Sequence, residues 1–179
     1  MASPISCLSI LVIPLLVTSL FYHVSNADRT LIESKCENST NNSFCLSALV
    51  SDPQSSTSNL YMLGIITTDL NLKVFEEADS RIPNLLDSLI DSLDRSQLSN
   101  CQTNLTDAHE TMKAARNTAG EQSYMEESNL LLVVFSNISH CKSQYEDPLI
   151  CESPISDLTS QMMDLFNISS VIIAMIDSS

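Results

Sequence analysis

Residues 101–120 read CQTNLTDAHETMKAARNTAG, and the spacing of the apolar and small side chains in this stretch predicts a helix. These side chains recur at alternating intervals of four and three: Cys101, Leu105, Ala108, Met112, Ala115 and Ala119. Such intervals bring the side chains onto one face of an α-helix, where they form a continuous stripe. A stripe of this kind has to be covered by apolar faces from other parts of the chain.

Three other segments carry comparable stripes. The last one has a single polar member: Ile155, Leu158, Met162, Leu165, Ser169, Ile172 and Ile176. The segment before it keeps the same spacing, with Glu127 at the one skipped position: Tyr124, Leu131, Val134, Ile138, Cys141 and Tyr145. An earlier segment, residues 57–78, is less regular: Leu60, Leu63, Ile66, Leu70 and Val74. The sequence therefore predicts four helices.

The expected helix ends agree with this division. Residues 94–97 and 123–126 have the spacing of a capping box, Gly120 can end the helix between them, and Ser153-Pro154 can start the last helix. Residues 82–93 remain open, because Pro83 argues for a break whereas four apolar residues, Leu85, Leu86, Leu89 and Ile90, argue for further helical turns.

The short connections between these helices favour antiparallel neighbours. We therefore expect an all-α fold, an up-down-up-down four-helix bundle over residues 54–179. Residues 28–53 hold two short segments around Cys36 and Cys45 and are expected to form a hairpin ahead of the bundle. The chain has only 2 glycines, which leaves little material for tight β-turns.

The first 27 residues are predicted to be a signal peptide. Residues 7–21 are almost wholly apolar, and Ser25-Asn26-Ala27 supplies the small residues that signal peptidase requires, so we expect cleavage after Ala27. The apolar run is short and contains Pro14, which argues against a permanent membrane anchor. The sequence thus predicts one secreted domain, residues 28–179.

Five cysteines remain after the signal peptide, an odd number in an oxidising compartment. Cys101 and Cys141 lie on the stripes of successive antiparallel helices, so a disulfide across that interface is reasonable. Cys36 and Cys45 would close the hairpin, which leaves Cys151 free. Pairing of Cys141 with Cys151 is the alternative.

Charge and composition exclude several classes of function. The chain has 22 acidic and 8 basic residues, a formal net charge of −14, which repels nucleic acids and anionic membranes. It would favour a basic protein partner, although an acidic surface also serves solubility alone. We expect a monomer, with a dimer as the alternative.

No catalytic or metal site is expected. The predicted mature chain has only His109 and His140, neither of them beside a nucleophile or carboxylate at a recognised spacing. His140-Cys141 lacks the further ligands of a zinc site, and no serine lies in a Gly-x-Ser-x-Gly motif. We therefore expect neither an enzyme nor a cofactor.

Five Asn-x-Ser/Thr sequons are glycosylation candidates and agree with secretion: Asn38, Asn41, Asn104, Asn137 and Asn167. Asn167 lies opposite the apolar stripe of its helix and is expected to have room for a glycan. Asn104 and Asn137 lie closer to their stripes, so crowding is expected there.

The cysteine framework and three flanking segments resemble the plant invertase and pectin methylesterase inhibitor family. The segments are residues 44–55 with Asp52-Pro53, residues 101–115 with their Cys-x3-Leu start, and Ser153-Pro154-Ile155. The resemblance implies a helical hairpin on a four-helix bundle, with the two disulfides named above. It also implies a protein of the plant cell wall (apoplast) that occludes the substrate cleft of a pectin methylesterase or of a cell-wall or vacuolar invertase.

Within this family, invertase inhibitors often carry Pro-Lys-Phe in the loop before the third bundle helix. Here Gln122-Ser123-Tyr124 occupies that place, which weakens the invertase interpretation. We expect target binding by this loop, Glu121, Gln122, Ser123 and Tyr124, with the exposed faces of the second and third bundle helices. The alternative is a secreted bundle that binds a hydrophobic ligand or a receptor without inhibiting an enzyme. A ligand carrier would need an internal cavity of about 300 Å³ or more.

Overall fold

The computed structural model describes residues 31–57, 59–146 and 153–178, and all regular structure within these ranges is helical. Residues 31–36 form a first helical stretch. The elements that follow are α2 (Asn42–Ser51), the short 3-10 helix η1 (Pro53–Thr57), α3 (Leu60–Ser88), α4 (Ser92–Gly120), α5 (Tyr124–Ser143) and α6 (Ser156–Asp177). The predicted all-α class is confirmed. The predicted signal peptide and Cys151 lie outside the described residues.

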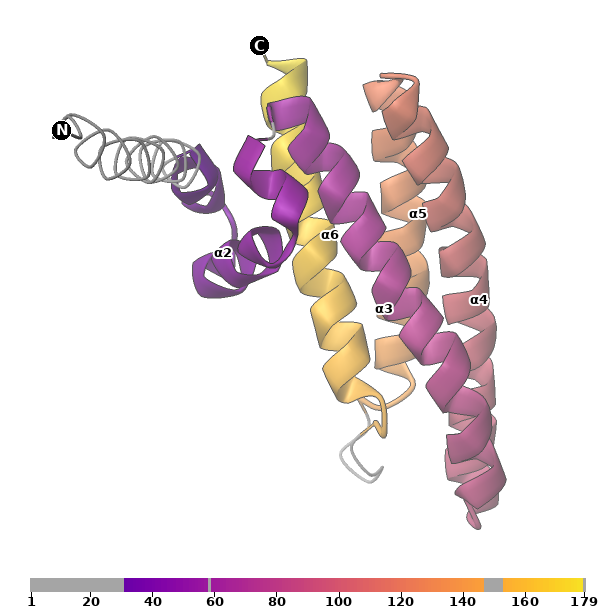
Figure 1. Ribbon diagram of the computed structural model, residues 1–179. Helices are drawn as coiled ribbons and strands as arrows, with labels where there is room; N and C mark the ends of the chain where they lie inside the picture. Colours follow the sequence, from indigo (N-terminus) through magenta and orange to yellow (C-terminus); the bar gives the residue numbers. More distant parts are fainter. Residues whose placement is uncertain (1–30, 58, 147–152, 179) are drawn as a thin grey trace, which may run out of the picture.

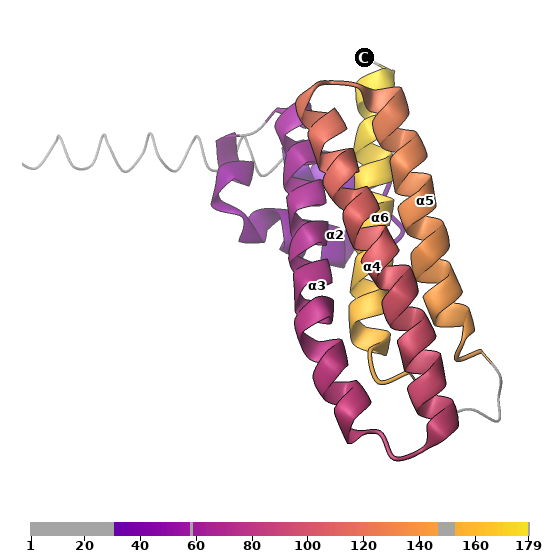
Figure 2. The ribbon, with the colours of Figure 1, turned by 90° about the vertical axis from the view of Figure 1, so that its right-hand side faces the viewer.

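Helices α3 to α6 form an up-down-up-down bundle, as predicted (Figures 1 and 2). Each helix packs on two neighbours: α3 and α5 both contact α4 on one side and α6 on the other. The α4–α5 turn lies at the same end as the C-terminus, and the α3–α4 turn lies at the opposite end (Figure 2).

The predicted apolar stripes form the core. All six stripe residues of α4 are at most 2 % exposed, and those of α6 from Ile155 to Ile172 are buried as well, including Ser169. The Ser169 hydroxyl donates a hydrogen bond to the Leu165 carbonyl, which removes the cost of its burial. The helical period in the sequence therefore identifies the buried faces correctly.

Helix α3 runs through Pro83, which settles the open question about residues 82–93. A proline inside a helix costs about 3 kcal/mol or more because it removes one backbone hydrogen bond. Ile82 is fully buried, and Leu85, Leu86 and Leu89 pack against the core. Partial burial of the three leucines, each contributing on the order of 1 kcal/mol, offsets that cost.

Two predicted helix starts are displaced. Asp91 rather than Asp94 caps α4, because its Oδ1 accepts hydrogen bonds from the N–H groups of Leu93 (2.8 Å) and Asp94 (3.1 Å). Helix α6 begins at Ser156 rather than directly after Ser153.

An ion pair holds the start of α6 against α3. Arg81 Nη1 lies 2.5 Å from Asp157 Oδ2, and Arg81 Nη2 donates to the Pro154 carbonyl at 3.0 Å. The hydrogen bond from Arg81 lowers the pKa of the Asp157 carboxyl.

Two disulfides join the elements, with the pairing expected from the sequence. Cys36 and Cys45 close the N-terminal hairpin, with Cα atoms 5.6 Å apart. Cys101 and Cys141 join α4 to α5 in the core, with Cα atoms 4.3 Å apart. The alternative partner for Cys141 is thereby excluded. The hairpin packs beside α3 and α6 (Figure 1).

Helix α6 is long and apolar enough to cross a membrane, judged by length and composition alone. In the folded chain, however, its buried residues pack into the bundle core, as in the central helix of many globular domains.

Replacing both Cys101 and Cys141 with serine is expected to lower the free energy of unfolding by about 4 kcal/mol, because the bond closes a long loop between two buried positions. The Cys36→Ser, Cys45→Ser variant should leave bundle unfolding nearly unchanged and loosen the hairpin alone. Urea unfolding followed by circular dichroism measures the first effect, and hydrogen exchange measures the second. Equal losses of bundle stability in the two variants would contradict this division.

Candidate functional site

The residues predicted to bind a target lie together at one end of the bundle. Glu121, Gln122 and Ser123 form the turn between α4 and α5, and Tyr124 is the first residue of α5. Glu121 and Gln122 are exposed, whereas Ser123 and Tyr124 are half-buried. The turn projects from the bundle end in Figure 2, where a partner can reach it.

The backbone of this turn is held by hydrogen bonds to the end of α4. The Gln122 N–H donates to the Ala119 carbonyl at 3.1 Å, and the Ser123 N–H donates to the Thr118 carbonyl at 3.0 Å. This pattern is a Schellman motif, in which the left-handed position is usually glycine. Here Gln122 occupies that position with φ 60°. Helix α4 ends at Gly120, as predicted, but Gly120 has no positive φ and the left-handed position falls two residues later.

Two tyrosines lie at this end of the bundle, and one of them binds the end of α4. The Tyr61 hydroxyl, from α3, donates to the Gly120 carbonyl at 3.1 Å. Burial, followed by the proximity of Tyr61 and Glu127, raises the pKa of Tyr124. Ser123 lies at the N-cap position expected for it, but its side chain makes no capping hydrogen bond.

Glu127 is a buried acid one turn into α5, at the skipped position of the stripe. Glu127 is 2 % exposed, and its Oε1 has no hydrogen-bond partner among the described residues. Burial raises the pKa of its carboxyl from 4.5 to about 7, and nearby Arg116 opposes the shift only in part. The Arg116 Nε is itself 2.5 Å from Asp69 Oδ1 on α3. Glu127 is thus largely protonated in mildly acidic solution.

The outer face of α5 is unusually apolar. Met125 is 83 % exposed, Leu132 58 % and Val133 49 %. Phe135 is 37 % exposed and packs on Phe166 of α6, with ring centroids 4.9 Å apart. The helical pattern predicted a role for the exposed helix faces in general but did not identify these residues. The signal was present in residues 130–135, LLLVVF, because one buried stripe needs only part of such a run.

A groove of about 300 Å³ lies between α5 and α6, beside the exposed face of α5. Its apolar lining comes from Met125, Leu131, Ile173 and Ala174, and the acidic Asp177 also lines it. Large exposed apolar surface on a folded chain indicates a protein interface or a ligand groove. The turn, the α5 face and this groove together form one candidate docking surface.

The histidines are not arranged for catalysis. His109 is buried between α3 and α4, with Nδ1 2.7 Å from Asp79 Oδ2 and its ring stacked on Phe75 at a centroid distance of 5.5 Å. His140 is exposed on α5. No group of three or more metal-ligating side chains occurs within the described part of the chain.

All five sequon asparagines lie within the described residues. Asn38 and Asn41 are exposed, and Asn104, Asn137 and Asn167 are half-buried. The Asn104 Nδ2 donates to the Asn100 carbonyl of its own helix at 3.1 Å. The Asn167 side chain meets the hairpin rather than open solvent. Glycan occupancy at these positions stays a prediction.

A family model described as plant invertase/pectin methylesterase inhibitor matches residues 30–175. A "Pectinesterase inhibitor" of Actinidia deliciosa is 25 % identical over 165 residues, which cover 92 % of this chain and 89 % of that protein.

Two solved structures share the fold. A mutant form of a pectin methylesterase inhibitor from Arabidopsis superposes with a TM-score of 0.70 at 18 % identity, covering 78 % of this chain and 93 % of that one. A second structure, of a pectin methylesterase inhibitor from Arabidopsis thaliana, gives 0.62 at 17 % identity, covering 82 % and 95 %.

Replacing Glu127 with Gln is expected to stabilise the protein at pH 7 by on the order of 2 kcal/mol and to change little near pH 4.5. The unfolded carboxyl ionises near 4.5, whereas the folded one keeps its proton up to about 7, so wild-type stability falls as the pH rises through this window. Urea unfolding at both ends of the window measures the difference. Glu126→Gln, an exposed change in the same turn, is the control, and equal pH dependence of Glu127→Gln and wild type would contradict the assignment.

Proposed function

Because the chain belongs to the plant invertase/pectin methylesterase inhibitor family, we propose that it is a secreted inhibitor that binds a pectin methylesterase one to one and covers the substrate cleft. The observation that carries this proposal is the family match over residues 30–175, essentially the whole predicted mature domain. The relatives are inhibitors, not enzymes.

Two observations favour pectin methylesterase over invertase as the target. The curated relative and the two solved structures are all named as inhibitors of pectin methylesterase or pectinesterase. In addition, Gln122-Ser123-Tyr124 stands where invertase inhibitors often carry Pro-Lys-Phe. A cell-wall or vacuolar invertase is the second candidate, because the family description includes both activities.

The candidate docking surface has the properties that such a complex needs. A stable protein interface buries about 800 Å² on each partner and is anchored by a few large apolar or aromatic side chains. Met125, Leu132 and Val133 supply exposed apolar area on α5, next to the hydrogen-bonded turn. Helix surfaces and a fixed turn lose little freedom when they dock.

Charge supports a basic partner. The net charge of −14 would attract a basic wall enzyme over a distance and would raise the association rate more than the final affinity.

Secretion to the plant cell wall is part of the proposal. Two disulfides fit an oxidising compartment, and residues 1–27 have the composition of a signal peptide. The alternative, a carrier of a hydrophobic ligand, would need an enclosed internal cavity. The α5–α6 groove and a second groove of about 310 Å³ between the hairpin and the bundle are both open to solvent.

The direct test is a titration of the disulfide-bonded protein against a plant pectin methylesterase and a cell-wall invertase in mildly acidic buffer. We expect loss of pectin methylesterase activity that saturates near equimolar protein, because a one-to-one complex closes each cleft. Loss of invertase activity alone would transfer the proposal to the second candidate. If neither activity changed, the inhibitor assignment would be wrong for this chain.

The docking surface is tested by replacing Leu132 and Met125 with serine. We expect the inhibition constant to rise at least about tenfold, equivalent to about 1.4 kcal/mol of lost binding free energy. Ile90→Ser is the matched control, because Ile90 is 98 % exposed but lies in the α3–α4 turn at the opposite end of the bundle. A comparable loss in the control, or none in the double variant, would place the contact elsewhere.

A further inference from the structure

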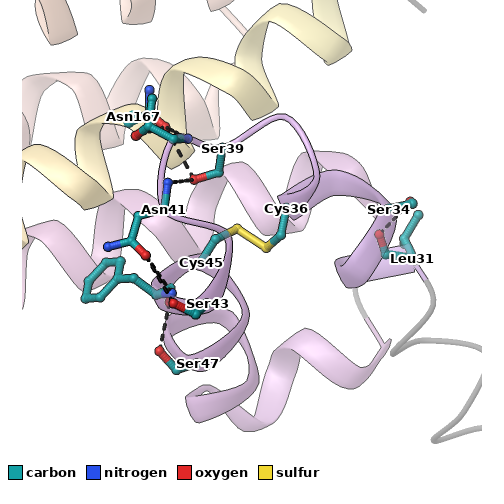
Figure 3. The surroundings of a disulfide bond; sticks show 11 residues. Leu31, Ser34, Cys36, Ser39, Asn41, Ser43, Cys45, Ser47 and Asn167 are labelled. Carbon is teal, nitrogen blue, oxygen red and sulfur yellow. Dashed lines mark hydrogen bonds between the residues drawn. A yellow bond between two sulfur atoms is a disulfide. The ribbon is translucent and has the colours of Figure 1, made fainter.

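Three of the five sequons meet where the N-terminal hairpin lies on α6. Asn38 and Asn41 are in the connection between the two hairpin helices, and Asn167 lies on α6 facing that connection (Figure 3). Ser39 and Thr40 complete the Asn38 sequon, so this junction holds both the acceptor side chains and the hydroxyl that a sequon requires.

The Asn167 side chain binds the connection through one atom. Its Oδ1 accepts hydrogen bonds from the Thr40 N–H at 3.0 Å, the Thr40 hydroxyl at 3.1 Å and the Ser39 hydroxyl at 3.4 Å. These contacts join segments far apart in the sequence. They also satisfy the backbone N–H of Thr40, which lies outside the helices.

Asn41 uses both ends of its amide. Its Oδ1 accepts from the Phe44 N–H at 3.3 Å and so caps α2, and its Nδ2 donates to Asp164 Oδ2 on α6 at 2.9 Å. A sugar on this nitrogen would be attached at the contact with α6. The nitrogen that glycosylation needs is therefore already engaged in holding the hairpin.

Asn38 differs from both neighbours. It is exposed, and its side-chain amide makes no hydrogen bond to any described residue. A sugar at this position would extend into solvent with the hairpin in place. The Thr40 hydroxyl of its sequon, however, is bonded to Asn167 in the folded chain.

We propose that Asn41 and Asn167 form a latch that holds the disulfide-closed hairpin on α6, and that Asn38 carries an N-linked oligosaccharide in the secreted protein. Transfer precedes folding, when the Thr40 hydroxyl is free, and a sugar on Asn41 or Asn167 would crowd the contacts between the hairpin and α6, so only chains unsubstituted at these two positions close the latch. In the transfer, Nδ2 of Asn38 loses one proton and bonds to the anomeric carbon of a lipid-linked oligosaccharide diphosphate. The bond between that carbon and the diphosphate oxygen breaks, and the lipid diphosphate leaves. The inference depends on the proposed export of the chain but not on the identity of its target.

The acceptor is tested by expressing the full chain in a plant secretory host and treating the protein from the medium with an amidase that removes N-glycans in ¹⁸O water. We expect ¹⁸O-labelled aspartate at position 38 and none at positions 41 and 167. Label at either of the latter positions, or secreted and disulfide-bonded protein without label at position 38, would overturn the proposal. Failure of the chain to reach the medium would overturn it together with export. Labelled protein that inhibits no enzyme would count against the proposed function alone.

The latch is tested with two substitutions that both destroy the Asn167 sequon. Asn167→Asp keeps an acceptor oxygen, whereas Asn167→Ala removes it. We expect the Thr40 N–H to exchange with solvent at least about tenfold faster in the alanine variant and at a nearly unchanged rate in the aspartate variant. Asn104→Ala, which removes a side chain that bonds only within its own helix, is the control. Unchanged exchange in Asn167→Ala would show that no latch exists.

Discussion

The bond between Cys101 and Cys141 fixes the relation on which the rest of the bundle depends. It joins α4 and α5, the most extensive helix pair of the structure, at two positions with no solvent exposure. A short turn already makes these helices antiparallel, and the disulfide sets their register along the shared stripe. Helix α3 then packs on α4, helix α6 packs on α5, and the contact between α3 and α6 completes the four-helix bundle. The apolar outer face of α5 is held in a defined orientation because its inner face is tied in this way.

The hydrophobic period was sufficient to predict the fold class, the four bundle helices and their buried faces, because burial of a stripe is a property of single helices. It could not decide whether α3 crosses Pro83, since that depends on how much core the later leucines meet. The capping box predicted at residues 94–97 was wrong, because the Asp91 side chain accepts the hydrogen bonds from the free N–H groups at the start of α4. Helix ends depend on local competition among several suitable residues, which the period does not describe.

The candidate site was predicted less completely. The turn at residues 121–124 could be placed because it separates two strong stripes, but its left-handed Gln122 could not be read from a pattern that suggested Gly120. Glu127 was visible as a gap in a stripe, yet only the structure shows that the gap is buried. Asn167 looked suitable for a glycan because it faces away from the bundle core. The hairpin that covers this face comes from a segment more than a hundred residues earlier, a tertiary contact that no local pattern contains.

The left-handed conformation of Gln122 also affects how a partner is bound. The turn loses its conformational entropy during folding rather than during binding. A residue with a side chain is confined more strongly than glycine, and holding it at φ 60° takes free energy from folding. The hydrogen bonds at the end of α4 and the Tyr61 contact offset this cost. A turn ordered in this way meets its partner already in one conformation. Affinity at this end of the molecule would therefore be governed by the residence time of the complex rather than by a slow rearrangement during encounter.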